Sequence, residues 1–431
     1  MIAGMTVNTV YVIVDTAFIG TLGTEALAAA TFVAPLVFLT MALTMGIGTA
    51  VTALVAQAVG REDAPSADAA AGTAISVGSA LGVAFGVLGL LAERWMLERL
   101  GAQGVVTDLA VQYFRVFAAV MPLFFVSVVL RSILTGEGDA KTPMVVLAIA
   151  TFVNLGLDAL FIFLFGMGLT GAALATVAAE LFSATAFAIL LLRREHAFVR
   201  LRLEALRPSR ATLAALFQLA IPIAASMVVM SVGTMLYNRL LASFGAIAVA
   251  AYGAASKVDM IVILPIFGLS GAAVTVVGMF AGAGRPDLVR STALYTYRWA
   301  ITLAAVIGGA AFVGSGSILG IFTDDPTAIE IGRTYLGFMI FAYPMMAVGM
   351  TTGRILQGLG HGFPALLITT IRVLLVGVPV AYVSVHVFGR SIEGVWTGIL
   401  TGGACATVTS ILMVRRLMWH SDPTVRAAAP A

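Results

Sequence analysis

The sequence predicts an all-α integral membrane protein in which twelve transmembrane helices form two pseudo-symmetric lobes of six helices each. Three observations predict this fold. Hydrophobic residues make up 60% of the 431-residue chain and charged residues only 10%, whereas a soluble domain carries about 25% charged residues. The apolar residues gather in segments of roughly 20 residues or more, the length that crosses a bilayer. Segments of the first half of the chain also recur in the second half.

Twelve apolar segments follow one another along the chain, separated by polar breaks. Because several are longer than 25 residues, we expect some helices to tilt or to continue beyond the hydrocarbon. The predicted spans are 1–20, 27–58, 70–92, 109–134, 143–165 and 170–192 in the first half, then 212–243, 248–281, 291–318, 329–357, 364–388 and 391–417. The expected N-terminal lobe, cytoplasmic linker, C-terminal lobe and cytoplasmic tail are 1–195, 196–211, 212–420 and 421–431.

Arginine sets the expected orientation. The break between the sixth and seventh spans carries six arginines, at positions 193, 194, 200, 202, 207 and 210. Cytoplasmic loops of membrane proteins are enriched in Lys and Arg, so we expect this break and both termini to be cytoplasmic. The net charge of +3 reflects this topology, and no nucleic-acid partner is expected. The sequence thus predicts a multi-pass protein of the cell (inner) membrane, in contact with membrane lipid.

The two halves resemble each other in three segments that occur in the same order. LGTEALAAATFVAP from Leu22 matches FGAIAVAAYGAASK from Phe244, VGRED from Val59 matches AGRPD from Ala283, and ILTGEGDAKTP from Ile133 matches ILQGLGHGFP from Ile355. The offsets are 222, 224 and 222 residues. Duplicated lobes of this kind are typical of transporters that bind their substrate between the repeats.

Polar side chains interrupt the apolar spans of the first half. Asn154 and Asp158 are four residues apart, so they share one face of a helix. A carboxylate in hydrocarbon is costly and is seldom present without a function. The counterparts of Asp15, Asn154 and Asp158 in the second half are Tyr237, Leu375 and Pro379. We therefore expect the intramembrane polar residues, and an ion or proton site, in the first lobe only.

The first span raises a question about the start of the chain. It is not expected to be a cleavable signal peptide, because it lacks a basic start and carries Asp15. Pro222 enters the seventh span, and its counterpart falls just before Met1. We expect either that the native start lies further upstream or that this helix is unusually short. Mass spectrometry of the native amino terminus distinguishes the two.

Several motifs resemble those of the multidrug and toxic compound extrusion (MATE) transporters. They are VDTAFIGTLG from Val14 followed by LAAA, LTGEGDAKTPM from Leu134, NLGLDALFIF from Asn154, and, in the second half, Pro265-x-x-Gly268 followed by VGMFAGAGRPD. The resemblance covers essentially the whole chain and is strongest to the prokaryotic, DNA-damage-inducible (DinF-like) subgroup. It implies a secondary antiporter with no cofactor and no enzymatic activity, and a monomeric state.

The resemblance also implies which residues couple transport to an ion. The matching positions of the subgroup's cation site are Asp15, Asn154, Asp158 and Thr176. Carboxylate, amide and hydroxyl oxygens suit Na⁺, whereas burial disfavours a charged carboxylate and suits H⁺, so both coupling ions stay open. The alternative role for each is a helix-pinning hydrogen bond, and a threonine in a membrane helix commonly bonds its own backbone.

Two further residues are candidates for the substrate cavity, namely Glu180 in the sixth span and Lys257 in the eighth. Lys257 is two residues from Asp259, so the two point to different faces, and snorkelling or a structural partner is the alternative for Lys257. Gly136-Glu137-Gly138-Asp139 spells a signature of intramembrane aspartyl proteases, but no Tyr-Asp pair supplies the second acid. The sequence also lacks a Walker A motif and His-Glu-x-x-His.

Together these features predict export of an amphipathic or cationic drug-like compound in exchange for H⁺ or Na⁺, by alternating access. Acidic side chains attract cations, and apolar walls suit aromatic ligands. The alternative function is a flippase or exporter of lipid-linked precursors, for which we expect membrane-depth Arg and Lys converging on a cavity.

Overall fold

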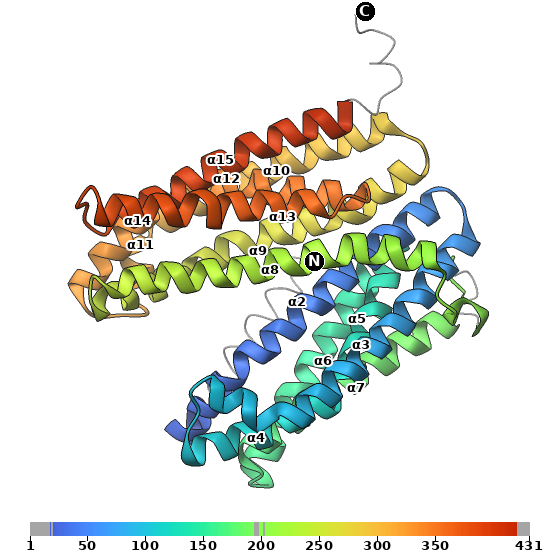
Figure 1. The fold of residues 1–431 in the computed structure, drawn as a ribbon, viewed down its shortest axis with the longest axis horizontal. Coiled ribbons are helices and arrows are strands. Elements are labelled where there is room, and N and C mark those ends of the chain that lie inside the picture. Colours follow the sequence, from blue (N-terminus) through green and yellow to red (C-terminus); the bar gives the residue numbers. More distant parts are fainter. Residues whose placement is uncertain (1–17, 19, 194–197, 201–202, 420–431) are drawn as a thin grey trace, which may run out of the picture. The chain divides into compact units, whose positions relative to one another are not determined.

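The computed structural model of the protein describes residues 18, 20–193, 198–200 and 203–419, and its regular elements there are all helices (Figure 1). In chain order they are α2 (Thr24–Gly60), α3 (Ala64–Arg99), α4 (Gly104–Ala119), α5 (Met121–Gly136), α6 (Lys141–Ala159), η1 (Leu160–Leu164), α7 (Gly168–Arg193), η2 (Leu203–Leu206), α8 (Arg210–Ala242), α9 (Ala246–Gly282), α10 (Pro286–Val313), α11 (Ser315–Leu319), α12 (Pro326–Gly358), α13 (Phe363–Thr370), η3 (Ile371–Gly377), α14 (Val378–His386), α15 (Glu393–Val414) and η4 (Arg415–Trp419).

The helices coincide with the predicted spans from 27–58 onward. Within the described residues, ten helices are long and apolar enough to cross a membrane, and α4 with α5, bent by 48°, forms an eleventh span. Such helices satisfy all their backbone hydrogen bonds internally, as hydrocarbon requires. The remaining predicted span, 1–20, lies almost wholly outside the described residues.

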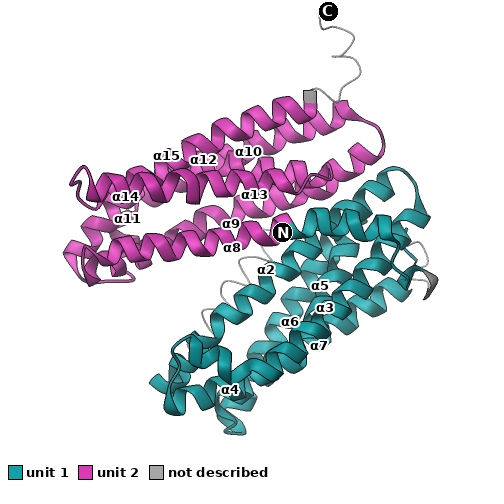
Figure 2. Cartoon of the chain, in the orientation of Figure 1, with its two compact units in different colours: residues 1–221 teal, residues 222–431 magenta. Residues whose placement is uncertain are grey.

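The chain divides into two compact units, residues 1–221 and 222–431 (Figure 2). In unit 1, α3 packs against α2, α4 and α5, and α7 packs against α5 and α6. In unit 2, α12 packs against α9, α10 and α15. The division falls inside α8, at Pro222, later in the chain than 212, the predicted start of the second lobe.

The duplication is visible in where helices begin and end. Helices α2 and α9 begin at Thr24 and Ala246 and end at Gly60 and Gly282, and the next helices begin at Ala64 and Pro286. Each of these pairs is 222 residues apart. The match of VGRED with AGRPD at 224 is therefore wrong by two residues, and one spacing holds for all three repeated segments.

The mismatch arises because each repeat has an aspartate near the start of the helix that follows this turn, but at different positions. Asp63 caps α3, where its Oδ1 accepts the Ser66 N–H at 3.1 Å. Hydrogen bonds with Ser66 hold the pKa of the Asp63 carboxyl below its usual range. The structural counterpart of Asp63 is Arg285, which forms an ion pair with Asp287 at 2.8 Å (Nη2 to Oδ2). Asp63 and Asp287 therefore have different roles and are not equivalent in the repeat.

Positive backbone φ angles recur at the same spacing. Gly23 and Gly245, before α2 and α9, have φ of 107° and 98°, and Gly138 and Gly360 have 93° and 89°. Most residues other than glycine are strained at such angles. The repeated glycines are therefore explained by the shape of the turns.

The two repeats differ in the helix around an equivalent proline. The predicted span 109–134 is broken between Ala119 and Met121, and Pro122 stands in the first turn of α5. Proline lacks the N–H that a continuous helix requires and clashes with the preceding turn. Its counterpart Pro344 lies inside α12, which is continuous. At the break, Gly82 of α3 is essential, since a Cβ there would lie 2.5 Å from the Pro122 Cα.

The segment after α7 is fastened to unit 1 by two carboxylates. The Val199 N–H donates to Glu137 Oε1 at 2.7 Å, and the Arg200 N–H donates to Asp68 Oδ1 at 2.6 Å. Glu137 follows α5 directly and Asp68 lies in the first turns of α3. The linker thus has a defined attachment to the ends of these helices.

The short helix η2 continues this attachment along α3. The Ser76 hydroxyl donates to the Leu206 carbonyl at 2.6 Å. At Gly72, a Cβ would lie 2.2 Å from the Ala205 carbonyl oxygen, a distance that no side chain tolerates. The glycine therefore allows the two backbones to touch.

Candidate functional site

The face of α6 that carries Asn154 and Asp158 is turned into unit 1. Asn154 is 3% exposed and Asp158 is 0% exposed. Their neighbours Phe152 and Gly156 are exposed on the opposite face. The spacing of four residues therefore buries both polar groups together, in the middle of a membrane-spanning helix.

Thr176 of α7 lies next to Asn154. The Asn154 Nδ2 atom donates to Thr176 Oγ1 at 3.5 Å, which is longer than a strong N–H···O bond. The Thr176 hydroxyl donates to the Ala172 carbonyl at 3.1 Å, so the predicted backbone bond of this threonine is present as well. Thr176 therefore offers only its lone pairs to the site.

The side-chain oxygen of Asn154 differs from the side-chain nitrogen in its hydrogen bonding. Its Oδ1 is buried and has no hydrogen-bond partner within the part of the chain that the structure describes. Leaving a buried acceptor unsatisfied costs about 1–3 kcal/mol. A proton donor or a cation beside this oxygen would remove that cost.

The structure assembles three of the four predicted coupling residues in one region of unit 1. Asn154 contacts Thr176, and Asp158 follows Asn154 by one helical turn. Asp15 lies outside the described residues.

Glu180 lies one turn beyond Thr176 on α7 and is half-buried. Its carboxylate hydrogen-bonds with the Ser127 hydroxyl and interacts electrostatically with Arg131, both on α5. A series of polar groups thus runs from Asp158 through Thr176 to Glu180 within unit 1. Ser127 and Arg131 were missed by the sequence reasoning, although an arginine inside the span 109–134 was a usable signal.

Unit 2 also contains a carboxylate within a membrane-spanning helix. Asp259 of α9 accepts the Tyr335 hydroxyl on Oδ2 and the Tyr343 hydroxyl on Oδ1, each at 2.6 Å. The ring of Trp396 meets that of Tyr335 edge-on, with 4.8 Å between centroids. The expectation that intramembrane polar residues belong to the first lobe only is therefore wrong. Lys257, on another face of α9, is exposed.

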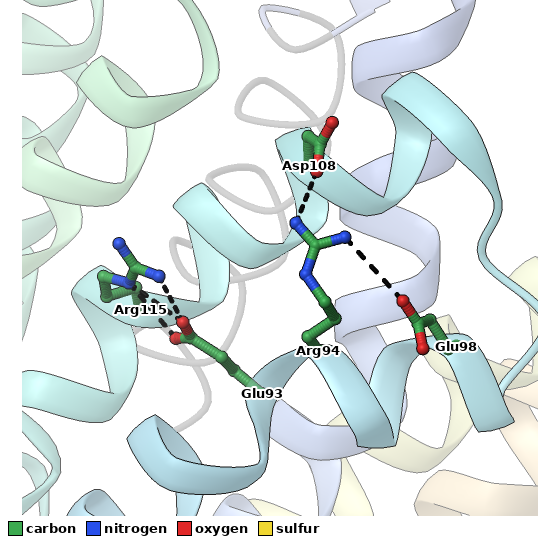
Figure 3. Close-up of polar contacts among 5 residues, drawn as sticks. All are labelled: Glu93, Arg94, Glu98, Asp108 and Arg115. Atoms are coloured by element: carbon green, nitrogen blue, oxygen red, sulfur yellow. Dashed lines mark hydrogen bonds and ion pairs between the residues drawn. The ribbon is translucent and has the colours of Figure 1, made fainter.

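A set of ion pairs joins α3 to α4 (Figure 3). Arg94 Nη2 is 2.6 Å from Asp108 Oδ1, and its Nη1 is 3.7 Å from Glu98 Oε1. Arg115 donates through Nε to Glu93 Oε1 at 3.0 Å and also through Nη2. Arg115 lies inside the predicted span 109–134, and its charge is paired with Glu93. Because Glu93 is 8% exposed, removal of Arg115 would leave a buried carboxylate without this partner, which is destabilising.

Metal-binding chemistry of the transition-metal kind finds no support in the described residues. They contain no group of three or more His, Cys, Asp or Glu side chains placed to hold a metal ion.

Two repeated units of long apolar helices, with polar side chains buried at membrane depth, define a multi-pass membrane transporter. The chain belongs to the MatE family, whose model matches residues 1–160 and 222–383. The two matches begin 221 residues apart, in agreement with the repeat. Structures of MATE transporters have twelve transmembrane helices, and the predicted fold class is confirmed. MATE transporters are not enzymes, which removes the protease alternative.

The relatives are similar over most of their length. The probable multidrug resistance protein NorM of Thermotoga maritima is 26% identical over 390 residues, covering 90% of this chain and 84% of its own. The probable multidrug resistance protein YoeA of Bacillus subtilis is 27% identical, covering 88% and 83%. An outward-facing multidrug resistance MATE transporter of known structure matches with a TM-score of 0.92 at 28% identity, covering 97% and 93%.

Proposed function

We propose that this transporter is a secondary antiporter that exports amphipathic, cationic drug-like compounds in exchange for H⁺ or Na⁺. The observation that carries the proposal is Asp158, a carboxyl group that is 0% exposed in an apolar membrane helix. It lies one turn from Asn154, whose buried Oδ1 has no hydrogen-bond partner among the described residues. Such a combination is costly and is expected where an ion binds.

The chemistry follows from the charge of Asp158. Burial disfavours the ionised form of this carboxyl group, and binding of a proton or Na⁺ would neutralise its charge. Na⁺ would draw on the oxygens of Asp15, Asn154, Asp158 and Thr176, whereas a proton needs only a carboxylate. Binding and release of either ion changes the charge at the α6–α7 interface by one. Alternating access requires that ion binding favour one of two conformations, and a change of charge at a helix interface can do so because the helices pack differently in the two conformations.

The finer features of the proposal rest on the sequence. They are the DinF-like subgroup, location in the cell (inner) membrane with both termini cytoplasmic, a monomeric state, and roles for Glu180 and Lys257 near the substrate. The relatives named for drug resistance favour drug export over a flippase of lipid-linked precursors. One relative, from Shewanella oneidensis and 24% identical over 400 residues, is named an FAD transporter, so FAD belongs among the compounds to be tested.

The test is transport by everted membrane vesicles that contain wild type, Asp158→Asn or Asp108→Asn. A fluorescent cationic dye is supplied, and a proton gradient and a sodium gradient are imposed in separate runs. We expect wild type and Asp108→Asn to accumulate dye under one of the gradients, because Asp108 is an exposed surface carboxylate. Asp158→Asn should lose the gradient-driven accumulation.

Two outcomes would overturn the proposal. If neither gradient moves dye or FAD in wild type, antiport of these compounds is refuted, and lipid-linked substrates are tested next. If Asp158→Asn equals wild type, the coupling site lies elsewhere, and Asp259→Asn becomes the next variant.

A further inference from the structure

An arginine lies inside the apolar span of unit 2 that runs from α13 through η3 to α14. Arg372 is nine residues beyond Phe363, where α13 begins, and fourteen residues before His386, where α14 ends. At 1.5 Å per residue these stretches are about 14 and 21 Å long. The span contains no other Asp, Glu, Lys or Arg. A charged side chain inside a span is rare and usually serves a function.

The guanidinium group of Arg372 also lies against the interior of the neighbouring helix. Arg372 Nη2 is 2.7 Å from Met230 Sδ of α8. Met230 is twenty residues after Arg210, where α8 begins, and nine residues before Arg239. These stretches are about 30 and 14 Å long. The side chain therefore does not extend to either basic end of α8, and snorkelling to the membrane surface does not explain it.

Tight packing fixes the backbone that carries this side chain. Arg372 belongs to η3 (Ile371–Gly377), a π-helix, and π-helical turns are frequent at functional sites. A Cβ on Gly402 of α15 would lie 2.2 Å from the Arg372 carbonyl oxygen, and one on Gly233 of α8 would lie 2.0 Å from Val373 Cγ1. The two glycines therefore hold η3 closely between α8 and α15. A side chain on a fixed backbone loses less conformational freedom when it binds a ligand.

The guanidinium group has unused hydrogen-bond donors. An arginine carries five N–H donors, and the methionine sulfur that it contacts is a weak acceptor. Its other neighbour is Tyr237 of α8, with which it interacts electrostatically. Among the residues that the structure describes, no carboxylate is paired with Arg372, whose side chain is half-buried. Removing a charge from water without an opposite charge is costly, so an acidic group from a ligand would stabilise it.

The first half of the chain lacks this arginine. By the pairing that matches Asn154 with Leu375, its counterpart is Thr151 of α6. The Thr151 hydroxyl donates to the Leu147 carbonyl of its own helix at 2.9 Å. The repeated fold thus forms in unit 1 without a charge at this position, which argues against a role of the arginine in holding the helices together.

We infer that Arg372 binds the acidic group, a carboxylate or a phosphate, of an amphipathic compound within unit 2. The fork of N–H donors matches two oxygens of such a group. Met230, 37% exposed, offers an adaptable apolar contact for an aromatic body beside it. A purely cationic compound is disfavoured at this position. The inference goes beyond the proposed antiport and does not rest on it, because binding is measured without an ion gradient.

A membrane lipid offers the same acidic group. In a bilayer, however, the phosphates lie outside a hydrocarbon core about 30 Å thick, whereas Arg372 lies inside an apolar span. We therefore expect a soluble compound, and the test includes a lipid for comparison.

The test is equilibrium binding of two fluorescent probes to the purified protein in an uncharged detergent. Dansylglycine carries a carboxylate, and dansylglycinamide has the same aromatic body without the charge. We expect wild type to bind dansylglycine about tenfold more tightly than the amide, because a hydrogen bond between charged groups contributes roughly that much in affinity. Arg372→Gln should bind both probes equally. Arg372→Lys keeps the charge without the fork and should retain part of the preference.

The matched control is Arg298→Gln. It removes the same charge from an exposed position of α10, a helix of unit 2 that packs against α9 and α12. This variant should keep the wild-type preference for dansylglycine.

Four results would refute the inference. They are no binding of dansylglycine by wild type at millimolar concentration, equal binding of the two probes by wild type, an unchanged preference in Arg372→Gln, and an equal loss in Arg298→Gln. The first two need no variant, so they hold even if a substitution impairs folding. Displacement of dansylglycine by phosphatidic acid, at concentrations where benzoate has no effect, would identify a lipid as the occupant instead.

Discussion

At the scale of single residues, the two units bury their carboxylates in different ways. Asp158 is enclosed within unit 1, one turn from an asparagine oxygen that lacks a hydrogen bond among the described residues. Asp259 in unit 2 has a tyrosine hydroxyl on each oxygen. A carboxylate whose oxygens are both occupied by protein donors is suited to holding helices together. A site that must take up and release an ion needs an unused acceptor, and the buried Oδ1 of Asn154 is one among the described residues, which favours unit 1 for coupling.

The tyrosines on Asp259 give a test at this scale. Tyr343→Phe removes the donor to Oδ1 and leaves that oxygen without this hydrogen bond. We expect the free energy of unfolding to fall by about 1–3 kcal/mol. The measurement is the thermal unfolding midpoint in detergent, with Tyr295→Phe as the control because Tyr295 is 61% exposed. If both variants match wild type, the hydrogen bonds to Asp259 do not stabilise unit 2.

At the scale of helices, most boundaries follow from the sequence because glycine, proline and charged residues interrupt uniformly apolar segments. The break between α4 and α5 does not follow from the sequence. The span 109–134 is apolar throughout, and Pro122 alone leaves open whether a helix bends or breaks. Pro344, at the equivalent position, lies within the continuous helix α12. Packing against α3 determines whether the helix breaks, because α3 accommodates the break only through Gly82.

For the polar residues too, the sequence predicts what lies within one helix but not the contacts between helices. The shared face of Asn154 and Asp158 is a property of one helix, so their spacing predicts it. Contacts between helices depend on how the helices pack. Asp259 bonds to tyrosines 76 and 84 residues further along the chain, and no local pattern indicates them. The contacts of Glu180 with α5 were missed for the same reason.

The attachment of the linker gives a test at the scale of elements. Gly72→Ala places a Cβ where the Ala205 carbonyl now lies, 2.2 Å away, so η2 must move from α3. We expect trypsin to cleave faster at the arginines of the linker, because a detached segment fits a protease more readily. A time course of limited digestion measures this. Gly156→Ala is the control, since nothing lies within 4 Å of its Cβ position. Identical rates would mean that the close contact does not hold the linker.

At the scale of the whole molecule, orientation in the membrane follows from where the charges lie. In the orientation that we propose from the positive-inside rule, the linker is cytoplasmic and the loop between α3 and α4 lies on the other side of the membrane. The ion pairs of Arg94 and Arg115 with acidic residues keep the charge at that loop balanced. The proposed orientation therefore assigns this network to the outer surface.

Cysteine labelling tests the orientation. In a Cys405→Ala background, Gln103→Cys lies between α3 and α4, and Pro208→Cys lies in the linker; both positions are exposed. A membrane-impermeant maleimide should label Gln103→Cys in intact cells and Pro208→Cys only after the membrane is opened. The cysteine-free background should stay unlabelled. Labelling in the opposite order would invert the proposed topology.

The paired turns have an evolutionary consequence. A duplicated gene begins with two identical copies, and each copy then accumulates changes separately. Gly23 and Gly245 have kept the same φ, whereas Glu62, at φ 55°, stands where the other copy has Gly284. A backbone angle that few residues adopt is hard to change in single steps. A buried carboxylate, by contrast, can arise in one copy alone. The turns therefore keep the backbone shape that the two copies had in common, whereas an ion-binding site can evolve separately in each half.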